Sequence, residues 1–97
     1  MYETMMKFAN EIGITVKEYP FEVVDGLLKG QQIGIRSTLP EEDKPRILAH
    51  EIAHAFLHPH RDLIKNPDRQ AEADADAAGD MLMQLIEYMR RPAHEAL

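Results

Sequence analysis

Cysteine is absent from this chain of 97 residues. Without cysteine the chain can form neither a disulfide framework nor a cysteine-based zinc ribbon. Any metal ion must therefore be held by histidine and carboxylate side chains, and the chain has five histidines and 17 acidic residues to offer. Because a domain of this length has a small core and here no covalent cross-link, a tightly bound metal ion could supply part of its stability.

An excess of positive charge is also lacking, because 11 basic residues stand against 17 acidic ones and the formal net charge is −6. Direct binding to nucleic-acid phosphates needs a basic surface, so we expect no nucleic-acid partner. No apolar stretch approaches the roughly 20 residues that cross a bilayer. The first eight residues lack the basic and apolar regions of a signal peptide. We therefore expect a cytoplasmic protein that does not bind membranes, while its oligomeric state stays open.

The chain reads as one globular domain spanning residues 1–97, because 44% of it is apolar and no linker or repeat divides it. The spacing of apolar residues and the positions of glycine and proline predict a helix at 2–11, strands at 14–21, 21–28 and 31–36, a helix at 43–58 and a helix at 67–91. The predicted fold class is α+β: an N-terminal helix, a small antiparallel β-sheet of two or three strands, a second helix and a long C-terminal helix.

The second predicted helix carries the pattern H-E-x-x-H as His50, Glu51 and His54. Four residues advance a helix by slightly more than one turn, so both imidazoles emerge from one face and can reach the same ion. Glu51 lies about 100° around the helix, close enough to accept a proton from a metal-bound water. The rest of this helix is apolar on nearly every side, and three ionisable groups in such a helix indicate a shared partner such as a metal ion.

A catalytic zinc ion usually takes three protein ligands. Glu72, at the border of the apolar stripe of the last helix, is the favoured third ligand. Asp76, one turn later on the same face, could hold a ligand imidazole through its second ring nitrogen. Asp80 is expected to belong to a solvated acidic ridge.

His60 is the alternative third ligand, because it follows His50 by the ten residues seen in H-E-x-x-H-x-x-G-x-x-H. That pattern needs a glycine to turn the chain back, and here Leu57 occupies the glycine position while Pro59 precedes the histidine. His58, two turns beyond His50, is either a second-shell partner of a ligand or an ordinary histidine at a helix end.

The stretches 47–59 and 71–83, with Lys29 and Gly30 followed by Ile33 and Ile35, resemble the ImmA/IrrE family of metallopeptidases. The resemblance covers about residues 11–83. It implies a minimal zincin-like domain with a gluzincin-like site, in which His50, His54 and Glu72 bind Zn2+ and Glu51 is the general base. Where the family pattern leads us to expect an aromatic residue, this chain has Asp76, so the spacing from Glu72 is that of the wider gluzincins.

The resemblance also implies the activity: a zinc-dependent endopeptidase in which Glu51 assists the attack of a zinc-bound water on a peptide bond. Its substrate would be a protein or peptide, with regulatory cleavage of a helix-turn-helix transcriptional repressor as the favoured case. Alternatives are a latent general minimal peptidase and a non-catalytic, zinc-stabilised interaction domain. A second oxyanion donor is expected, and the residues leave the choice open among Tyr19, Tyr88, His58 and His60.

An extended substrate could add a strand to an exposed sheet edge. The segment 31–36 is the expected edge strand. The segment 92–97 carries His94 and Glu95, which could block the cleft, although a frayed end is the more ordinary interpretation.

Overall fold

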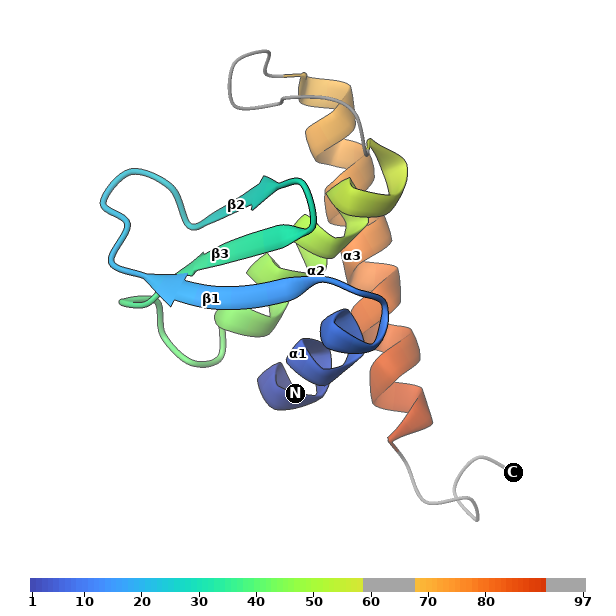
Figure 1. The fold of residues 1–97 in the computed structure, drawn as a ribbon. Helices are drawn as coiled ribbons and strands as arrows, with labels where there is room; N and C mark the ends of the chain where they lie inside the picture. The colour runs from blue at the N-terminus through green and yellow to red at the C-terminus, as the bar shows by residue number, and fades with distance from the viewer. Residues whose placement is uncertain (59–67, 91–97) are drawn as a thin grey trace.

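The computed structural model describes residues 1–58 and 68–90. These residues form three helices and one small sheet, whose arrangement is drawn in Figure 1. In chain order the elements are α1 (Tyr2–Glu11), β1 (Thr15–Tyr19), β2 (Gly26–Lys29), β3 (Gln32–Arg36), α2 (Lys44–Leu57) and α3 (Arg69–Met89). The predicted α+β class is confirmed, and the elements occur in the predicted order.

The sheet is mixed, which corrects the expectation of a wholly antiparallel sheet. Its strand order is β1-β3-β2. β2 and β3 form an antiparallel hairpin whose turn contains Gly30 in the left-handed region, with φ 61°. β1 pairs with β3 in parallel, with Val16 opposite Ile33. After β1 the chain first forms β2, which lies at the far edge of the sheet. β3 then returns between β2 and β1, and so it runs parallel to β1.

The edge strands also differ from the expectation. β3, which contains most of the segment 31–36, is the central strand and is paired on both sides, so it offers no free edge. β2 is one of the two edge strands, and it is shorter than the predicted segment 21–28. Residues 20–25 form a loop between β1 and β2, and Pro20 ends β1 because proline cannot donate to a strand ladder.

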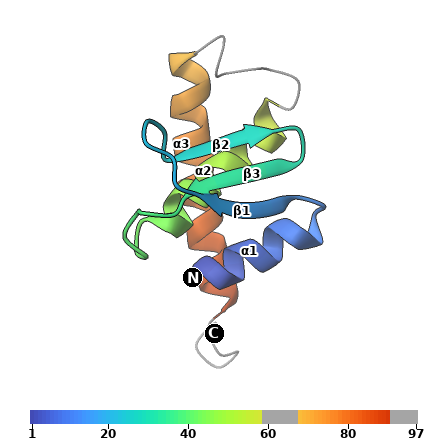
Figure 2. The same cartoon turned by 60° about the vertical axis from the view of Figure 1, so that its left-hand side comes forward.

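The core lies between the sheet and α2. Figures 1 and 2 show α2 behind the sheet, with α3 packed on the far side of α2 and α1 along the edge beside β1. The largest fully buried side chains come from three layers of this arrangement and are Met5, Ile33, Ile35, Leu48 and Ile52. α2 is therefore covered on both sides, which explains why it is apolar around most of its circumference.

The start of α2 is held under the sheet by a buried lysine. Lys44 is only 4% exposed, and its ammonium group contacts Glu18 Oε1 of β1 at 3.1 Å and Glu41 Oε1 at 2.6 Å. The Tyr2 hydroxyl donates to the other oxygen of Glu18 at 2.9 Å. The carboxylates of Glu18 and Glu41 and the ring of Tyr2 thus compensate the buried ammonium charge of Lys44. These contacts link α1, β1 and α2.

α3 begins at Arg69, two residues after the predicted start. Its N-cap is Asp68, whose carboxylate accepts hydrogen bonds from the backbone N–H groups of Gln70 at 2.9 Å and Ala71 at 3.2 Å. The predicted cap at Asn66 and Pro67 lies outside the described residues. Within residues 1–58 and 68–90, no helix is long and apolar enough to cross a membrane.

Small residues let α3 lie close to α2. Ala71, Ala75 and Gly79 recur every four residues along α3 and are all buried. A Cβ atom added to Gly79 would lie 3.1 Å from the carbonyl carbon of Ala49 and 3.1 Å from the nitrogen of His50. Because these neighbours are backbone atoms, they cannot give way without moving one helix. Gly79 therefore sets the distance between the two helices beside His50.

We predict that Gly79→Ala lowers the free energy of unfolding by about 1–3 kcal/mol, through overpacking against the backbone of α2. Helix propensity alone would give the opposite sign, a stabilisation of about 1 kcal/mol. Urea unfolding of the two proteins measures the difference. Ala77→Gly, at an exposed position of the same helix, is the control and should lose only the intrinsic propensity. A Gly79→Ala protein more stable than wild type would contradict the account.

Candidate metal centre

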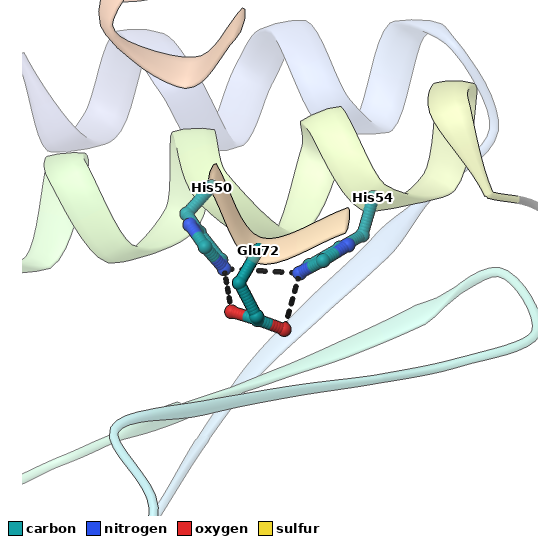
Figure 3. A group of neighbouring side chains, drawn as sticks. All are labelled: His50, His54 and Glu72. Carbon is teal, nitrogen blue, oxygen red and sulfur yellow. Dashed lines mark hydrogen bonds and ion pairs between the residues drawn. The ribbon is translucent and has the colours of Figure 1, made fainter. Parts of the chain in front are cut away.

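His50 and His54 lie one turn apart on α2, and both point toward the first turns of α3 (Figure 3). Their Nε2 atoms are 3.0 Å apart, and the rings meet edge to face at an interplanar angle of 82°. His54 is 5% exposed, and His50 is partly buried. The four-residue spacing on a helix thus brings two nitrogen donors to one point.

Glu72 reaches the same point from α3. One carboxylate oxygen is 2.9 Å from His50 Nε2, and the other is 3.1 Å from His54 Nε2. The nitrogen and oxygen donors of these three residues all lie within 4.8 Å of one another. Figure 3 shows the carboxylate bridging the two imidazoles. The Asp68 cap and the close packing at Gly79 orient α3 so that Glu72, in its first turn, faces α2.

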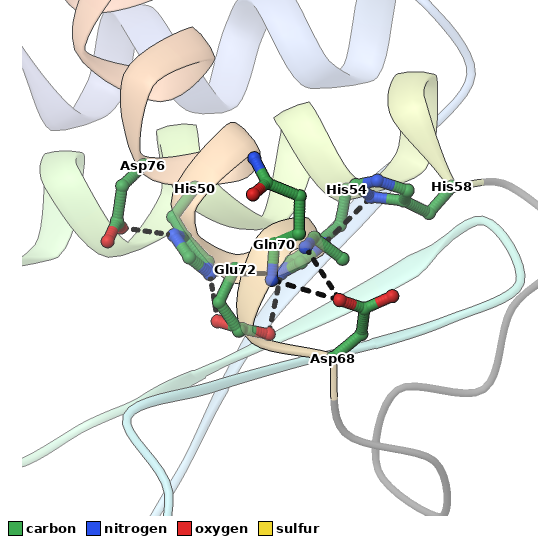
Figure 4. Close-up of polar contacts among 8 residues, drawn as sticks. His50, His54, His58, Asp68, Gln70, Glu72 and Asp76 are labelled. Carbon is green, nitrogen blue, oxygen red and sulfur yellow. Dashed lines mark hydrogen bonds and ion pairs between the residues drawn. The ribbon is translucent and has the colours of Figure 1, made fainter.

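Asp76 contacts the opposite nitrogen of His50. Its Oδ1 atom lies 2.6 Å from His50 Nδ1 (Figure 4). A carboxylate can only accept, so Nδ1–H donates and, in the neutral ring, Nε2 carries the lone pair that faces Glu72. The structure therefore places Asp76 at the imidazole contact that its position one turn after Glu72 suggested.

His58 lies on the outer side of His54. The two Nδ1 atoms are 3.4 Å apart, at the end of α2. A hydrogen bond in which His54 Nδ1–H donates to His58 would leave the lone pair of His54 on Nε2 as well. Burial, together with the nearby His50, lowers the pKa of His54, which favours this neutral form.

The donor set fits a divalent metal ion. When both rings are neutral and carry their protons on Nδ1, the lone pairs of the two Nε2 atoms face the Glu72 carboxylate. No hydrogen lies between these three electron-rich groups, so they repel one another. A cation at their centre removes this repulsion. The spacings of 2.9–3.1 Å are close to the roughly 3.3 Å between ligand atoms of a tetrahedral ion bound at about 2.0–2.1 Å. His50, His54 and Glu72 could therefore hold one metal ion.

Glu51 lies beside this group, buried between α2 and the start of β2, and is 8% exposed. Burial raises the pKa of its carboxyl to about 7, and the Glu72 carboxylate acts in the same direction while His50 opposes it. A bound cation would lower this pKa again. A carboxyl group with a pKa near neutrality can both accept and return a proton.

Gly26 is a residue of the site that sequence reasoning did not identify. A Cβ atom there would lie 2.8 Å from Ile47 Cγ2 and 3.2 Å from Glu51 Oε2. The absence of a side chain thus lets β2 lie directly over Glu51. The sequence signal is the pair Asp25-Gly26, which is typical of a turn, whereas Gly26 is the first residue of β2.

A pocket of about 240 Å³ lies behind His50, on the side of its ring that faces Asp76. Arg46, Gly79 and Asp80 complete its lining. Arg46 lies one turn before His50 on α2 and is a second residue that sequence reasoning did not single out. Asp80 is exposed, as expected for a solvated acidic residue, and is not among the three converging donors.

Two candidates for the oxyanion donor lie away from the converging donors. Tyr19 is on the face of β1 opposite to Glu18, whose side chain reaches Lys44 of α2, so the phenol points away from α2. Tyr88 follows Glu72 by 16 residues, which is about 24 Å along α3. His58 remains near His54. His60, the alternative third ligand, and the segment 92–97 lie outside the described residues.

Comparison with known proteins gives one family. The model of the IrrE N-terminal-like domain, Peptidase_M78, matches residues 9–88. This span includes all three converging donors, Glu51 and Asp76. Neither the curated proteins nor the solved structures contain a significant match to the chain.

We predict that, without bound metal, the free energy of unfolding falls as the pH rises from about 4.5 to about 7, by up to about 3 kcal/mol from Glu51 alone. The sign follows because the folded protein binds the Glu51 proton more tightly than the unfolded chain does. Urea unfolding in EDTA at pH 5 and pH 8 tests it. Glu51→Gln should be more stable than wild type at pH 8 and similar at pH 5. Parallel pH profiles for the two proteins would contradict the burial of Glu51.

Proposed function

The chain belongs to the IrrE N-terminal-like domain family of metallopeptidases, and on that premise we propose that it is a zinc-dependent endopeptidase. The observation that carries the proposal is the convergence of His50 Nε2, His54 Nε2 and the Glu72 carboxylate, with Asp76 behind His50. Two imidazoles and one carboxylate are a ligand set known for catalytic zinc. We assign these three residues as the zinc ligands and Glu51 as the general base.

When bound, zinc supplies a Lewis acid that lowers the pKa of a coordinated water to roughly 7 and polarises a carbonyl group. Glu51 would accept a proton from the water that attacks the scissile carbonyl carbon, and would pass it to the amide nitrogen as the C–N bond breaks. One water is consumed, and the products are a carboxyl group and an amine. The burial of Glu51 supports this role because it raises the proton affinity of the carboxylate and so opposes the lowering of its pKa by a bound cation.

Asp76 and His58 would act through the histidines. Asp76 fixes the His50 ring by accepting from Nδ1–H at 2.6 Å, so that Nε2 faces Glu72. His58 would do the same for His54 with a neutral acceptor at 3.4 Å. The carboxylate makes the stronger contact, so His50 is the more firmly oriented of the two rings.

The substrate would bind along β2, which takes the role first expected for the segment 31–36. Arg36 N–H donates to Asp25 O at 2.8 Å, so these two residues form a hydrogen-bonded pair. Hydrogen-bonded and non-hydrogen-bonded pairs alternate from there along the hairpin. Gly26 and Leu28 therefore direct their backbone N–H and C=O groups away from β3. Since Gly26 also lies over Glu51, an extended peptide paired with this edge would pass beside the general base.

For the substrate we propose a helix-turn-helix transcriptional repressor or a similar small cytoplasmic partner. This rests on the family resemblance and on the free edge of β2, which would accept an extended segment of a partner.

A structural role for the metal is the second candidate. It is favoured by the contact between α2 and α3, where the buried residues of the N-terminal half of α3 are only Ala71, Ala75 and Gly79. Such small side chains bury little apolar area, so an ion bridging the two helices would stabilise their contact.

We predict that Glu51→Gln abolishes cleavage while one zinc per chain is retained, because the amide cannot accept the proton and Glu51 is not among the ligands. Wild type and variant are incubated with the candidate repressor, fragments are identified by mass spectrometry, and zinc is measured on the same samples. Glu42→Gln, at an exposed position before α2, is the matched control and should cleave normally. Equal cleavage by the Glu51→Gln protein would contradict the assignment of the base, and a loss of folding in this variant would indicate the structural role instead.

A further inference from the structure

A second concave site lies on the other face of the sheet. Ile33 and Ile35 of β3 are buried toward α2, so the alternating residues Gln32 and Gly34 belong to the face turned away from the helices. On this face is a depression of about 160 Å³. Figure 2 shows the sheet standing in front of α2, so the sheet separates this depression from the metal donors on α2 and α3.

The depression lies beside a glycine of the central strand, against which two aromatic rings pack. In the register of the sheet, Lys17 of β1 and Leu27 of β2 flank Gly34 on either side. Phe21 and Tyr19 form one wall and stack with ring centroids 5.5 Å apart. A Cβ atom on Gly34 would lie 2.9 Å from Phe21 Cζ, so any side chain at this position would displace the aromatic wall. Gly34 is itself buried, because the two aromatic rings lie against it, and the depression is bounded by these rings and by Leu27.

The charge of this site is opposite to that of the whole chain. Lys17 and Lys29 line the depression, and among the described residues no carboxylate does. In the part of the chain that the structure describes, neither lysine has an acidic group within ion-pair distance. The chain as a whole carries −6. A negatively charged ligand is therefore attracted to this face and repelled by most of the remaining surface.

We propose that this depression binds an acidic segment of a partner protein, which inserts one aromatic or branched aliphatic side chain between Phe21 and Leu27. Its flanking carboxylates pair with Lys17 and Lys29 at the rim. The volume of about 160 Å³ holds a single side chain, as expected for an anchor residue, and is too small for most drug-sized ligands. The proposal does not depend on the peptidase function, because no residue of the metal group lines the site.

Single-stranded nucleic acid is the competing occupant, since bases also stack on aromatic side chains. The phosphate backbone, however, needs a basic groove that follows it over several nucleotides. Here, within the described ranges of the chain, the sheet offers only Lys17 and Lys29 without an ion-pair partner, and the chain has a net charge of −6. Arg36, the third basic residue of the strands, pairs with Asp25 at 3.6 Å. The observations therefore favour an acidic peptide.

The experiment uses fluorescein-labelled Asp-Glu-Phe-Glu-Asp as the probe, with fluorescence anisotropy for affinity and amide chemical shifts for location. Binding should shift the amide signals of Leu27, Gln32 and Gly34. Lys29→Glu and Lys17→Glu should each weaken binding by about tenfold or more, and Lys7→Glu, which makes the same charge change on α1, should alter it by less than twofold. Replacing phenylalanine in the probe by serine should remove most of the affinity.

Gly34→Ala provides a test that leaves every charge in place, and should weaken binding because Phe21 is displaced. Circular dichroism and thermal melting establish that each variant is folded. Equal weakening by Lys7→Glu would overturn the proposal, as would shifts confined to Glu51 and Glu72, which would mean that the peptide only enters the metal cleft. Tighter binding of a thymidine oligonucleotide at the same residues would also overturn it, in favour of nucleic acid.

Discussion

The close contact between α2 and α3 is the constraint on which the rest of the site depends. His50 and His54 need only their own helix to face one another, but Glu72 and Asp76 reach them from a helix 18 to 26 residues later in the chain. That reach requires the two backbones to approach until no Cβ atom fits at Gly79. The Asp68 cap then begins α3 so that Glu72 falls in its first turn and Asp76 one turn later. Spacing, capping and the small side chains of α3 together define the geometry of the donors.

The electrostatics of the site impose a second requirement. Glu51 is almost fully buried, and burial is the main cause that raises the pKa of its carboxyl to about 7. Beside it, Asp76 requires a proton on His50 Nδ1 and thereby leaves a lone pair facing the Glu72 carboxylate. A domain of 97 residues without disulfides has little stability with which to offset such an arrangement. A metal ion at the convergence point would resolve the repulsion and bridge the two helices, so stability and chemistry would have the same source.

Much of the fold followed from local patterns. The start signal at Asp43 and Pro45 and the stop at Pro59 gave the bounds of α2 to within a residue or so, and the apolar stripe that includes Ala71 and Ala75 gave α3. The same helical spacing suggested that Glu72 and Asp76 share one face. Local patterns carry no information about which strands pair, and so the parallel pairing of β1 with β3 and the central position of β3 were missed. Gly26 and Gly79 were missed for the same reason, because each is required by a backbone that lies far away in the sequence.

The most direct test of the account is the zinc content per chain of the purified protein, measured by elemental analysis on wild type, Glu72→Ala and His60→Ala. The account predicts about one zinc per chain in wild type and in His60→Ala, and a large loss in Glu72→Ala. A wild-type protein that holds no zinc after incubation with zinc and dialysis would contradict the metal centre. Loss with His60→Ala alone would contradict the choice of Glu72 as the third ligand.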